Sequence, residues 1–266
     1  MRSIRHAWLL LPLMLTALAG CGGGGVFGGV NLISIEEEWE MGRQIEAQIA
    51  QEMDLVRDQV ALNYINNLGQ RLVSETELSD LPWEFHIVED PSINAFNVPG
   101  GHVYVHTGLI READSAGELA GVMGHEIAHG VERHATEQMT QQYGLSVLAA
   151  LVLGQNPSVM EQIVAQIVGT GAVAKFSRDD EREADGLGVR YMYDAGYNPD
   201  GMVSMFQTLL AQRQSSPGAL EQFFSTHPLS EERIDNIQAE IDALPPTDQL
   251  TMHESGFRTL QQRVGS

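Results

Sequence analysis

Residues 115–134 read SAGELAGVMGHEIAHGVERH, and this stretch decides the fold. It opens with Ser115 and Glu118, which form a capping box, the pattern in which two side chains bond the free backbone N–H groups at a helix start. The sequence therefore predicts a helix that begins after Ser115 and continues to about His134.

Two histidines on this helix are spaced for a metal ion. Residues 125–129 read His-Glu-Ile-Ala-His, and residues four apart share one helix face, so His125 and His129 can present two imidazoles to one cation. Glu126 is placed to take a proton from a metal-bound water. Zinc suits the site because it accepts imidazole and carboxylate and lowers the pKa of its water to about 7. The alternative is an exposed helix with unconnected histidines, since His134 adds another one.

A catalytic zinc keeps three protein ligands and one open position, so a third ligand is needed. The best candidate lies in residues 176–185, FSRDDEREAD. Glu181 and Asp185 are four residues apart, so Glu181 can bind the metal while Asp185 orients a ligand histidine. Glu183 points away from Glu181 around the same helix and is expected in solvent. The competing interpretation is an ordinary acidic helix start.

The rest of the chain predicts further helices around a small sheet, an α+β plan that is mostly helical. Helices are expected from the capping box Ser34–Glu37, over residues 62–72, and from near Ser177, Asp200 and Ser230. Strands are expected at 83–90, 93–98 and 102–106, the last two joined by the turn Pro99-Gly100-Gly101.

The region 136–174 is apolar and predicted to be helical. Its two apolar pieces, 144–153 and 159–174, are each shorter than the roughly 18 residues of a membrane span, so we expect packed or lid-like helices. Pro245-Pro246 is expected to close a domain of residues 34–246. Residues 247–266 are then expected to form a loosely attached tail.

The N-terminus has the features of a processing segment. Residues 1–20 combine a basic start with a short apolar stretch, as in a signal peptide. Leu18-Ala19-Gly20-Cys21 is similar to the bacterial lipobox, which implies lipidation of Cys21 and a glycine-rich tether over 21–33. The glycine after Cys21 favours the outer membrane among lipoproteins, so an anchor on its periplasmic side is expected. An ordinary cleaved signal with a chance cysteine is the alternative.

Composition excludes one class of partner. The chain has 36 acidic and 15 basic side chains and a formal net charge of −21, so no nucleic-acid partner is expected. The lone cysteine cannot form an internal disulfide.

Four motifs together resemble one protein family. HEIAH, followed about fifty residues later by FSRDDEREAD, resembles zinc metallopeptidases of the HtpX and CAAX-prenyl-protease type, which have a gluzincin-type domain. Residues 94–109 (NAFNVPGGHVYVHTGL) are similar to that family's strand pair above the metal cleft. Thr226-His227-Pro228 with Arg233 resembles a motif of its periplasmic BepA-like and LoiP-like branch.

The resemblance implies peptide-bond hydrolysis with one zinc ion per chain, held by His125, His129 and Glu181. Glu126 would be the catalytic base, and the family's ExxxD maps onto Glu181 and Asp185. Two roles are open for His227. As a fourth ligand it would hold the enzyme inactive, and as a donor it would stabilise the oxyanion of the intermediate.

The implied substrates are unfolded or misassembled envelope proteins. They are expected to pair as an extra strand along Asn94, Ala95, Phe96, Asn97 and Val98, which could equally form an ordinary edge strand. Two other functions stay open: a chaperone-like assembly factor for outer-membrane proteins that seldom cleaves, and a structural zinc protein in which His227 permanently fills the fourth position. A structural site has no use for a base at Glu126.

Overall fold

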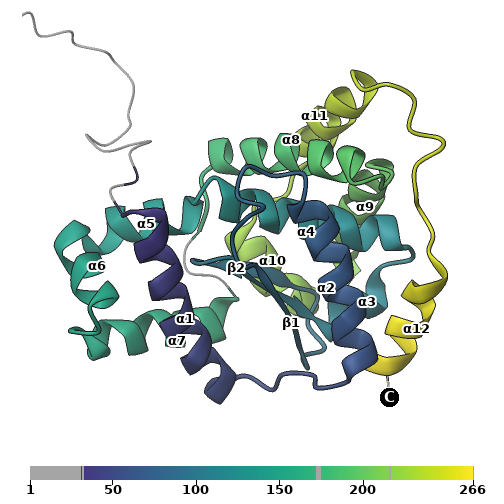
Figure 1. Cartoon of the computed structure of the whole chain (residues 1–266). Coiled ribbons are helices and arrows are strands. Elements are labelled where there is room, and N and C mark those ends of the chain that lie inside the picture. Colours follow the sequence, from purple (N-terminus) through teal and green to yellow (C-terminus); the bar gives the residue numbers. More distant parts are fainter. Residues whose placement is uncertain (1–30, 32, 172–174, 216, 266) are drawn as a thin grey trace, which may run out of the picture.

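In a computed structural model of the chain, helices surround a three-stranded sheet (Figure 1). The structure describes residues 31, 33–171, 175–215 and 217–265. The elements are α1 (Ile35–Glu52), α2 (Gln59–Val73), β1 (Glu84–Val88), β2 (Ala95–Val98), β3 (His102–His106), α3 (Thr107–Glu112), α4 (Ala116–Val131), α5 (His134–Tyr143), α6 (Leu145–Val152), α7 (Pro157–Thr170), α8 (Arg178–Asp194), α9 (Asp200–Ser215), η1 (Pro217–Leu220), α10 (Glu221–Thr226), α11 (Glu231–Asp242) and α12 (Ser255–Val264). The predicted mostly helical α+β fold class is confirmed.

The sheet has the strand order β1-β3-β2, with β1 parallel and β2 antiparallel to β3. The predicted turn joins β2 to β3. Gly100 and Gly101 have φ values of +86° and +75°, which glycine adopts without strain. A Cβ atom on Gly100 would lie 2.9 Å from the Cα of Gly42 on α1. The turn therefore also sets how closely α1 approaches the sheet.

The two faces of the sheet build separate cores, because successive side chains of a strand point to opposite faces. Phe85, Ile87 and Val103 belong to the larger core, which α2 and α4 share. Phe96 and Tyr104 belong to a smaller core with α1, α6 and α7. Figure 1 shows these last helices as a side lobe next to the sheet.

Helix α4, which carries the HEIAH motif, lies at the centre of the molecule, and every one of its residues is buried. One half of its predicted capping box forms, since the Glu118 N–H donates to the Ser115 hydroxyl at 3.1 Å, while the Glu118 carboxylate accepts from the Asp114 N–H instead of that of Ser115. Helices α8 and α9 pack against it. A Cβ atom on Gly201 of α9 would lie 2.3 Å from the carbonyl carbon of Gly117, so only small residues allow this approach.

The predicted continuation of this helix to about His134 is wrong. Helix α4 ends at Val131, and Arg133 has a left-handed φ of 60° before α5 begins at His134. The Arg133 guanidinium donates to the buried carboxylate of Glu38 at 2.6 Å and also to the backbone carbonyl of Ile33. This contact with α1, which is distant in sequence, holds the turn and overrides the local helical pattern.

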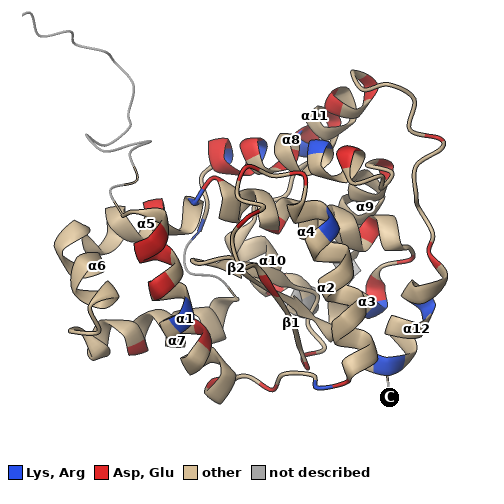
Figure 2. Ribbon diagram, in the orientation of Figure 1, with Lys and Arg blue, Asp and Glu red and all other residues tan. Residues whose placement is uncertain are grey.

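The described part of the apolar region, residues 136–171, forms packed helices, as predicted. Leu148, Met160, Ile163 and Ile167 of α6 and α7 are buried in the smaller core. Helix α6 has no charged residue, and its ribbon is tan throughout in Figure 2. Among the described residues, no helix is long and apolar enough to cross a membrane.

The prediction of a loosely attached tail over residues 247–266 is wrong. Helix α12 packs against α2 and α3, and Phe257, Leu260 and Val264 are buried (Figure 1). The Gln261 amide donates to two backbone carbonyls at the end of α3. The apolar side chains recur at helical spacing, so they form one stripe that the larger core covers.

Candidate metal centre

Four residues singled out in the sequence meet at one buried point. Helix α4 supplies His125 and His129, α8 supplies Glu181, and His227 follows α10. The Nε2 atom of His125 lies 3.1 Å from His129 Nε2 and 3.3 Å from His227 Nδ1. Glu181 Oε1 lies 3.5 Å from His129 Nε2 and 3.0 Å from His227 Nδ1. All four side chains are shielded from solvent.

The spacing of these atoms suits a tetrahedral metal ion. Donors bound at about 2.0–2.1 Å in that geometry lie about 3.3 Å apart, and the four separations given above run from 3.0 to 3.5 Å. Three imidazoles and a carboxylate form a donor set that zinc accepts. Their lone pairs would otherwise face one another without water, which is costly in a buried site. The residues therefore fit a metal ion.

Behind His125, a buried ion pair holds the ligand in place. His125 Nδ1 lies 3.0 Å from Asp185 Oδ1. Arg233 of α11 donates to both Asp185 oxygens, at 2.8 and 2.7 Å, and also to Glu181. Burial alone would raise the pKa of Asp185, but Arg233 and His125 outweigh burial and lower this pKa. Asp185 thus stays ionised beside His125 Nδ1, an arrangement that leaves His125 Nε2 for the cluster; that Asp185 orients a ligand histidine stays a prediction.

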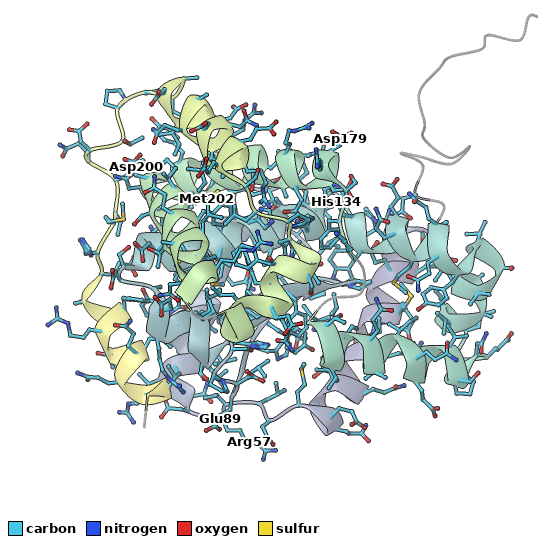
Figure 3. All side chains as sticks on the ribbon, turned by 180° about the vertical axis from the view of Figure 1, so that it is seen from behind. Arg57, Glu89, His134, Asp179, Asp200 and Met202 are labelled. Carbon is cyan, nitrogen blue, oxygen red and sulfur yellow. The ribbon has the colours of Figure 1, made fainter. Side chains whose placement is uncertain are left out.

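Behind His129, the polar contact comes from a residue to which the sequence assigned no role. His134 Nδ1 lies 2.8 Å from His129 Nδ1, and its Nε2 lies 3.5 Å from the Glu183 carboxylate. The Phe176 ring stacks on His129 with 4.0 Å between ring centroids. Figure 3 labels His134 in the interior, between helices. Glu183 is 55 % exposed, as predicted, yet it faces His134.

Glu126 lies beside the four donors and is fully buried. Among the described residues, neither of its carboxylate oxygens accepts a hydrogen bond of ordinary geometry. Its Oε1 lies 3.6 Å from His227 Nε2. Burial raises the pKa of Glu126, and the neighbouring His227 and His125 only partly oppose it. A raised pKa brings a carboxylate nearer to the pH at which a general base works well.

Glu181 differs from Glu126 in charge. Burial alone would raise the pKa of Glu181, but the contacts with His227, His129 and His125 outweigh it and hold the pKa well below its ordinary value. The two glutamates of the site are therefore suited to different tasks, because Glu181 is a permanent anion and Glu126 can exchange a proton.

Comparison with known proteins agrees with this arrangement. The model of peptidase family M48 matches residues 61–241, about two thirds of the chain. The chain belongs to peptidase family M48. The beta-barrel assembly-enhancing protease of Escherichia coli (strain K12) is 30 % identical over 223 residues, and that of Yersinia pestis is 32 % identical over 225; each match covers 80 % of this chain and 46 % of the relative.

A further relative is the mitochondrial metalloendopeptidase OMA1 of Schizosaccharomyces pombe. It is 33 % identical over 175 residues, which are 66 % of this chain and 51 % of the relative. The chain spans about half the length of the curated relatives it matches.

In this M48 chain the expected substrate strand lies at an edge of the sheet, next to α4. The strand covers Ala95–Val98, and Asn94 precedes it; all five residues are buried. Within the described chain the side-chain amide nitrogens of Asn94 and Asn97 have no hydrogen-bond partner. A strand that pairs with substrate and an ordinary edge strand both lie at the edge of a sheet, so this position fits either role. Recognition of substrate there stays a prediction.

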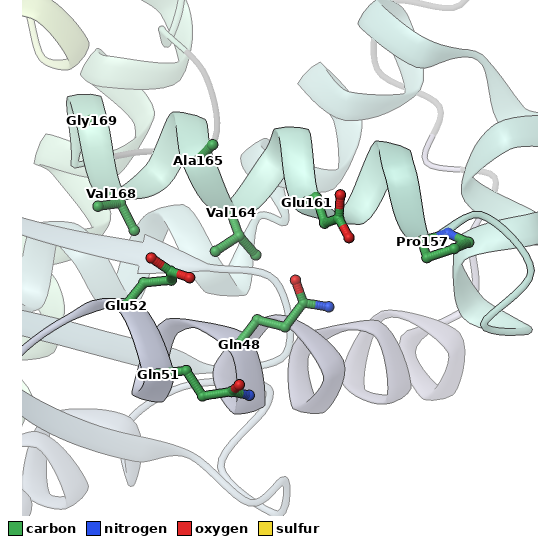
Figure 4. A pocket seen from close by; sticks show the side chains of 9 residues that line it. All are labelled: Gln48, Gln51, Glu52, Pro157, Glu161, Val164, Ala165, Val168 and Gly169. Atoms are coloured by element: carbon green, nitrogen blue, oxygen red, sulfur yellow. The ribbon is translucent and has the colours of Figure 1, made fainter.

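Several hollows lie near the surface of the described part of the chain. A cavity of about 270 Å³ between α8 and the start of α11 reaches Glu181 and Arg233. A groove of about 550 Å³ lies away from the metal cluster, between α1 and α7 (Figure 4). Since the ligand atoms are buried, a polypeptide reaches them only when the segments that cover them move.

The expected lipidation site, Cys21, lies outside the described residues, as do the signal peptide and most of the expected tether. These sequence features stay predictions.

Proposed function

We propose that this chain is a zinc-dependent endopeptidase that hydrolyses peptide bonds of unfolded or misassembled envelope proteins. The observation that carries the proposal is the convergence of His125, His129 and Glu181 beside the buried carboxylate of Glu126, which lacks a hydrogen bond of ordinary geometry among the described residues. Membership of family M48 supports a catalytic metal site rather than a structural one.

The residues of the site divide the chemistry between them. His125, His129 and Glu181 would hold one zinc ion, which when bound supplies Lewis acidity and lowers the pKa of a water molecule to about 7. Glu126 takes a proton from the attacking water on a carboxylate oxygen. The water oxygen bonds to the scissile carbonyl carbon, the C–N bond breaks, and Glu126 delivers the proton to the leaving amine.

His227 is proposed to plug the resting site. Its Nδ1 atom lies among the ligand atoms, 3.0 Å from Glu181 Oε1, where a fourth ligand would lie. A plugged site would limit cleavage in an envelope that contains many unfolded precursors. The other role, an oxyanion donor, requires His227 to leave the ligand cluster and face the substrate instead.

The substrate is proposed from the names of the relatives, and the location from the expected lipid anchor on Cys21. Several relatives are named beta-barrel assembly-enhancing protease, which supports a role in the quality control of envelope proteins. Main-chain pairing along residues 94–98 would make recognition tolerant of sequence. A lipid anchor on Cys21 would hold the enzyme at the periplasmic side of the outer membrane.

The test is cleavage of casein and of denatured outer-membrane protein by the unaltered chain and by Glu126→Gln. We expect Glu126→Gln to lose at least about 100-fold in activity, the contribution typical of a general base, and to retain one zinc per chain. Glu132→Gln, an exposed position at the end of α4, is the matched control and should stay active.

Two results would contradict the proposal. Full activity in Glu126→Gln would show that Glu126 is not the general base. An unaltered chain that prevents aggregation of the substrate without cleaving it would favour the chaperone-like function. His125→Ala, His129→Ala and Glu181→Ala should each lose zinc together with activity.

A further inference from the structure

A second group of metal-binding side chains lies on the sheet, apart from the cluster on α4. Glu84 and His86 are on β1, and His102 is on the neighbouring strand β3. In the parallel register Glu84 pairs with His102, and His86 pairs with Tyr104. Side chains two residues apart on a strand point to the same face, so Glu84, His86 and His102 lie together on one face of the sheet.

The three donor atoms converge. Glu84 Oε2 lies 3.9 Å from His86 Nε2 and 4.0 Å from His102 Nδ1, and the two ring nitrogens are 3.4 Å apart. An ion in the plane of these three atoms and equidistant from them would lie about 2.2 Å from each, the shortest distance that this spacing allows, at the upper end of the ~2.0–2.2 Å bonds that zinc makes to histidine and carboxylate. Small movements of the side chains would bring all three bonds to their ordinary lengths.

Burial around the group is graded. The His102 side chain is 4 % exposed and that of His86 is 16 % exposed, whereas that of Glu84 is 57 % exposed. The imidazoles are thus held inside the fold and the carboxylate side opens to water. An ion can enter from that side, and water can complete its coordination.

Packing holds the imidazoles in place. The His102 ring lies almost wholly inside the fold. The His86 ring also stacks on Tyr104 with 4.6 Å between ring centroids, which limits its rotation.

Helix α1 faces the group with charges of both signs. Arg43 is near enough to act on His102, but its guanidinium is paired with the Glu40 carboxylate. Glu46 lies near enough to Glu84 for the two carboxylates to interact, which together with burial raises the pKa of Glu46. The group therefore has the carboxylates of Glu46 and Glu84 beside it, while the charge of Arg43 is offset by Glu40. The net negative charge attracts a cation.

We propose that Glu84, His86 and His102 bind a second metal ion, a borderline divalent cation such as Zn²⁺, with water as the remaining ligand. Two imidazoles and a carboxylate suit this class of ion better than Ca²⁺ or Mg²⁺, which prefer oxygen ligands. The ion would join β1 to β3 at the end of the sheet where the turn 99–101 meets α1. The site shares no residue with the cluster on α4 and does not rest on the proposed peptidase activity.

The test counts zinc ions on the full chain. The protein is stripped of metal with a chelator and titrated with Zn²⁺ by calorimetry, and bound zinc is counted by atomic absorption. We expect two ions per chain, with the ion on the sheet bound more weakly than the ion at the α4 cluster, because its carboxylate ligand is 57 % exposed whereas the α4 cluster is buried.

Three variants locate the weaker ion. Glu84→Gln changes an exposed side chain and should lower the affinity for the weaker ion by more than about tenfold. The affinity for the ion at the α4 cluster should not change. His86→Phe keeps an aromatic ring against Tyr104 but removes the donor, and should leave one ion per chain. Glu89→Gln, an exposed acid just beyond β1 that is labelled in Figure 3, is the control and should bind two.

Two outcomes would overturn the proposal. One is a single zinc ion on the unaltered chain. The other is a second ion that Glu84→Gln and His86→Phe both retain at unchanged affinity, since it would then bind elsewhere. Circular dichroism of each variant confirms that a lost ion does not reflect a lost fold.

Discussion

The ion pair behind His125 can be tested by the substitution Asp185→Asn. Asparagine keeps the size of the side chain but removes its charge and replaces one acceptor oxygen with an N–H₂ donor. Asp185 now accepts two hydrogen bonds from Arg233 and lies 3.0 Å from His125 Nδ1. In the variant the N–H₂ group stands either at Oδ1, which faces both His125 and Arg233, or at Oδ2, which faces Arg233 alone. Arg233 loses an acceptor in both cases, and His125 no longer faces a carboxylate charge.

The size of the effect follows from the position of Asp185 one contact away from the metal. Loss of such a partner typically lowers metal affinity 10- to 100-fold, which corresponds to about 1.4–2.7 kcal/mol. At saturating zinc the stabilisation by the bound ion falls by the same free energy. For a domain of this size the zinc-induced rise in Tm should therefore be about 3–10 °C smaller than in the unaltered chain.

Two measurements check the prediction for Asp185→Asn: the zinc affinity by competition with a chelator, and the Tm with and without zinc. The matched control is Asp179→Asn in the first turn of the same helix, whose side chain is 88 % exposed and should leave both quantities unchanged. Unchanged affinity in Asp185→Asn would refute the orienting role. Complete loss of zinc, as expected for Glu181→Ala, would make Asp185 a direct ligand instead.

Three further predictions concern the plug, the C-terminal helix and the anchor. His227→Ala should raise casein cleavage and retain zinc if His227 blocks the resting site, and should lower cleavage if it is an oxyanion donor; unchanged activity and zinc affinity would exclude both roles. Leu260→Ala, a fully buried position on α12, should lower the free energy of unfolding by about 2–5 kcal/mol in urea titrations, whereas the exposed Arg258→Ala should change it by less than about 0.5 kcal/mol. Cys21→Ala should move the protein from the membrane fraction to the soluble fraction or leave it unprocessed, and a mature, membrane-bound variant would contradict the lipoprotein hypothesis.

The sequence by itself determined the features that depend on local helix geometry. The caps at Ser34, Ser115 and Ser177 form where the sequence places them, because capping needs only residues three apart. His125 and His129 share a face for the same local reason. Alternation predicted the strand within 83–90, and the turn Pro99-Gly100-Gly101 marked the two strands that it joins; each strand has one face against each core.

The tertiary structure decided which of these pieces meet. His227 lies 102 residues from His125 in sequence, and no local pattern brings their nitrogens to 3.3 Å. The place of His134 behind His129 depends on the left-handed turn at Arg133, which a buried carboxylate on α1 holds.

The same reason explains what the sequence missed. The helices α3 and α10 have six residues each, too few for an apolar period to be recognised. Helix α12 does carry an apolar stripe, but the sequence of the helix does not tell that α2 and α3 cover this stripe in the fold. Glu84, His86 and His102 come together only because β1 runs parallel to β3 in one register, and alternation within a strand specifies its faces but not its neighbour.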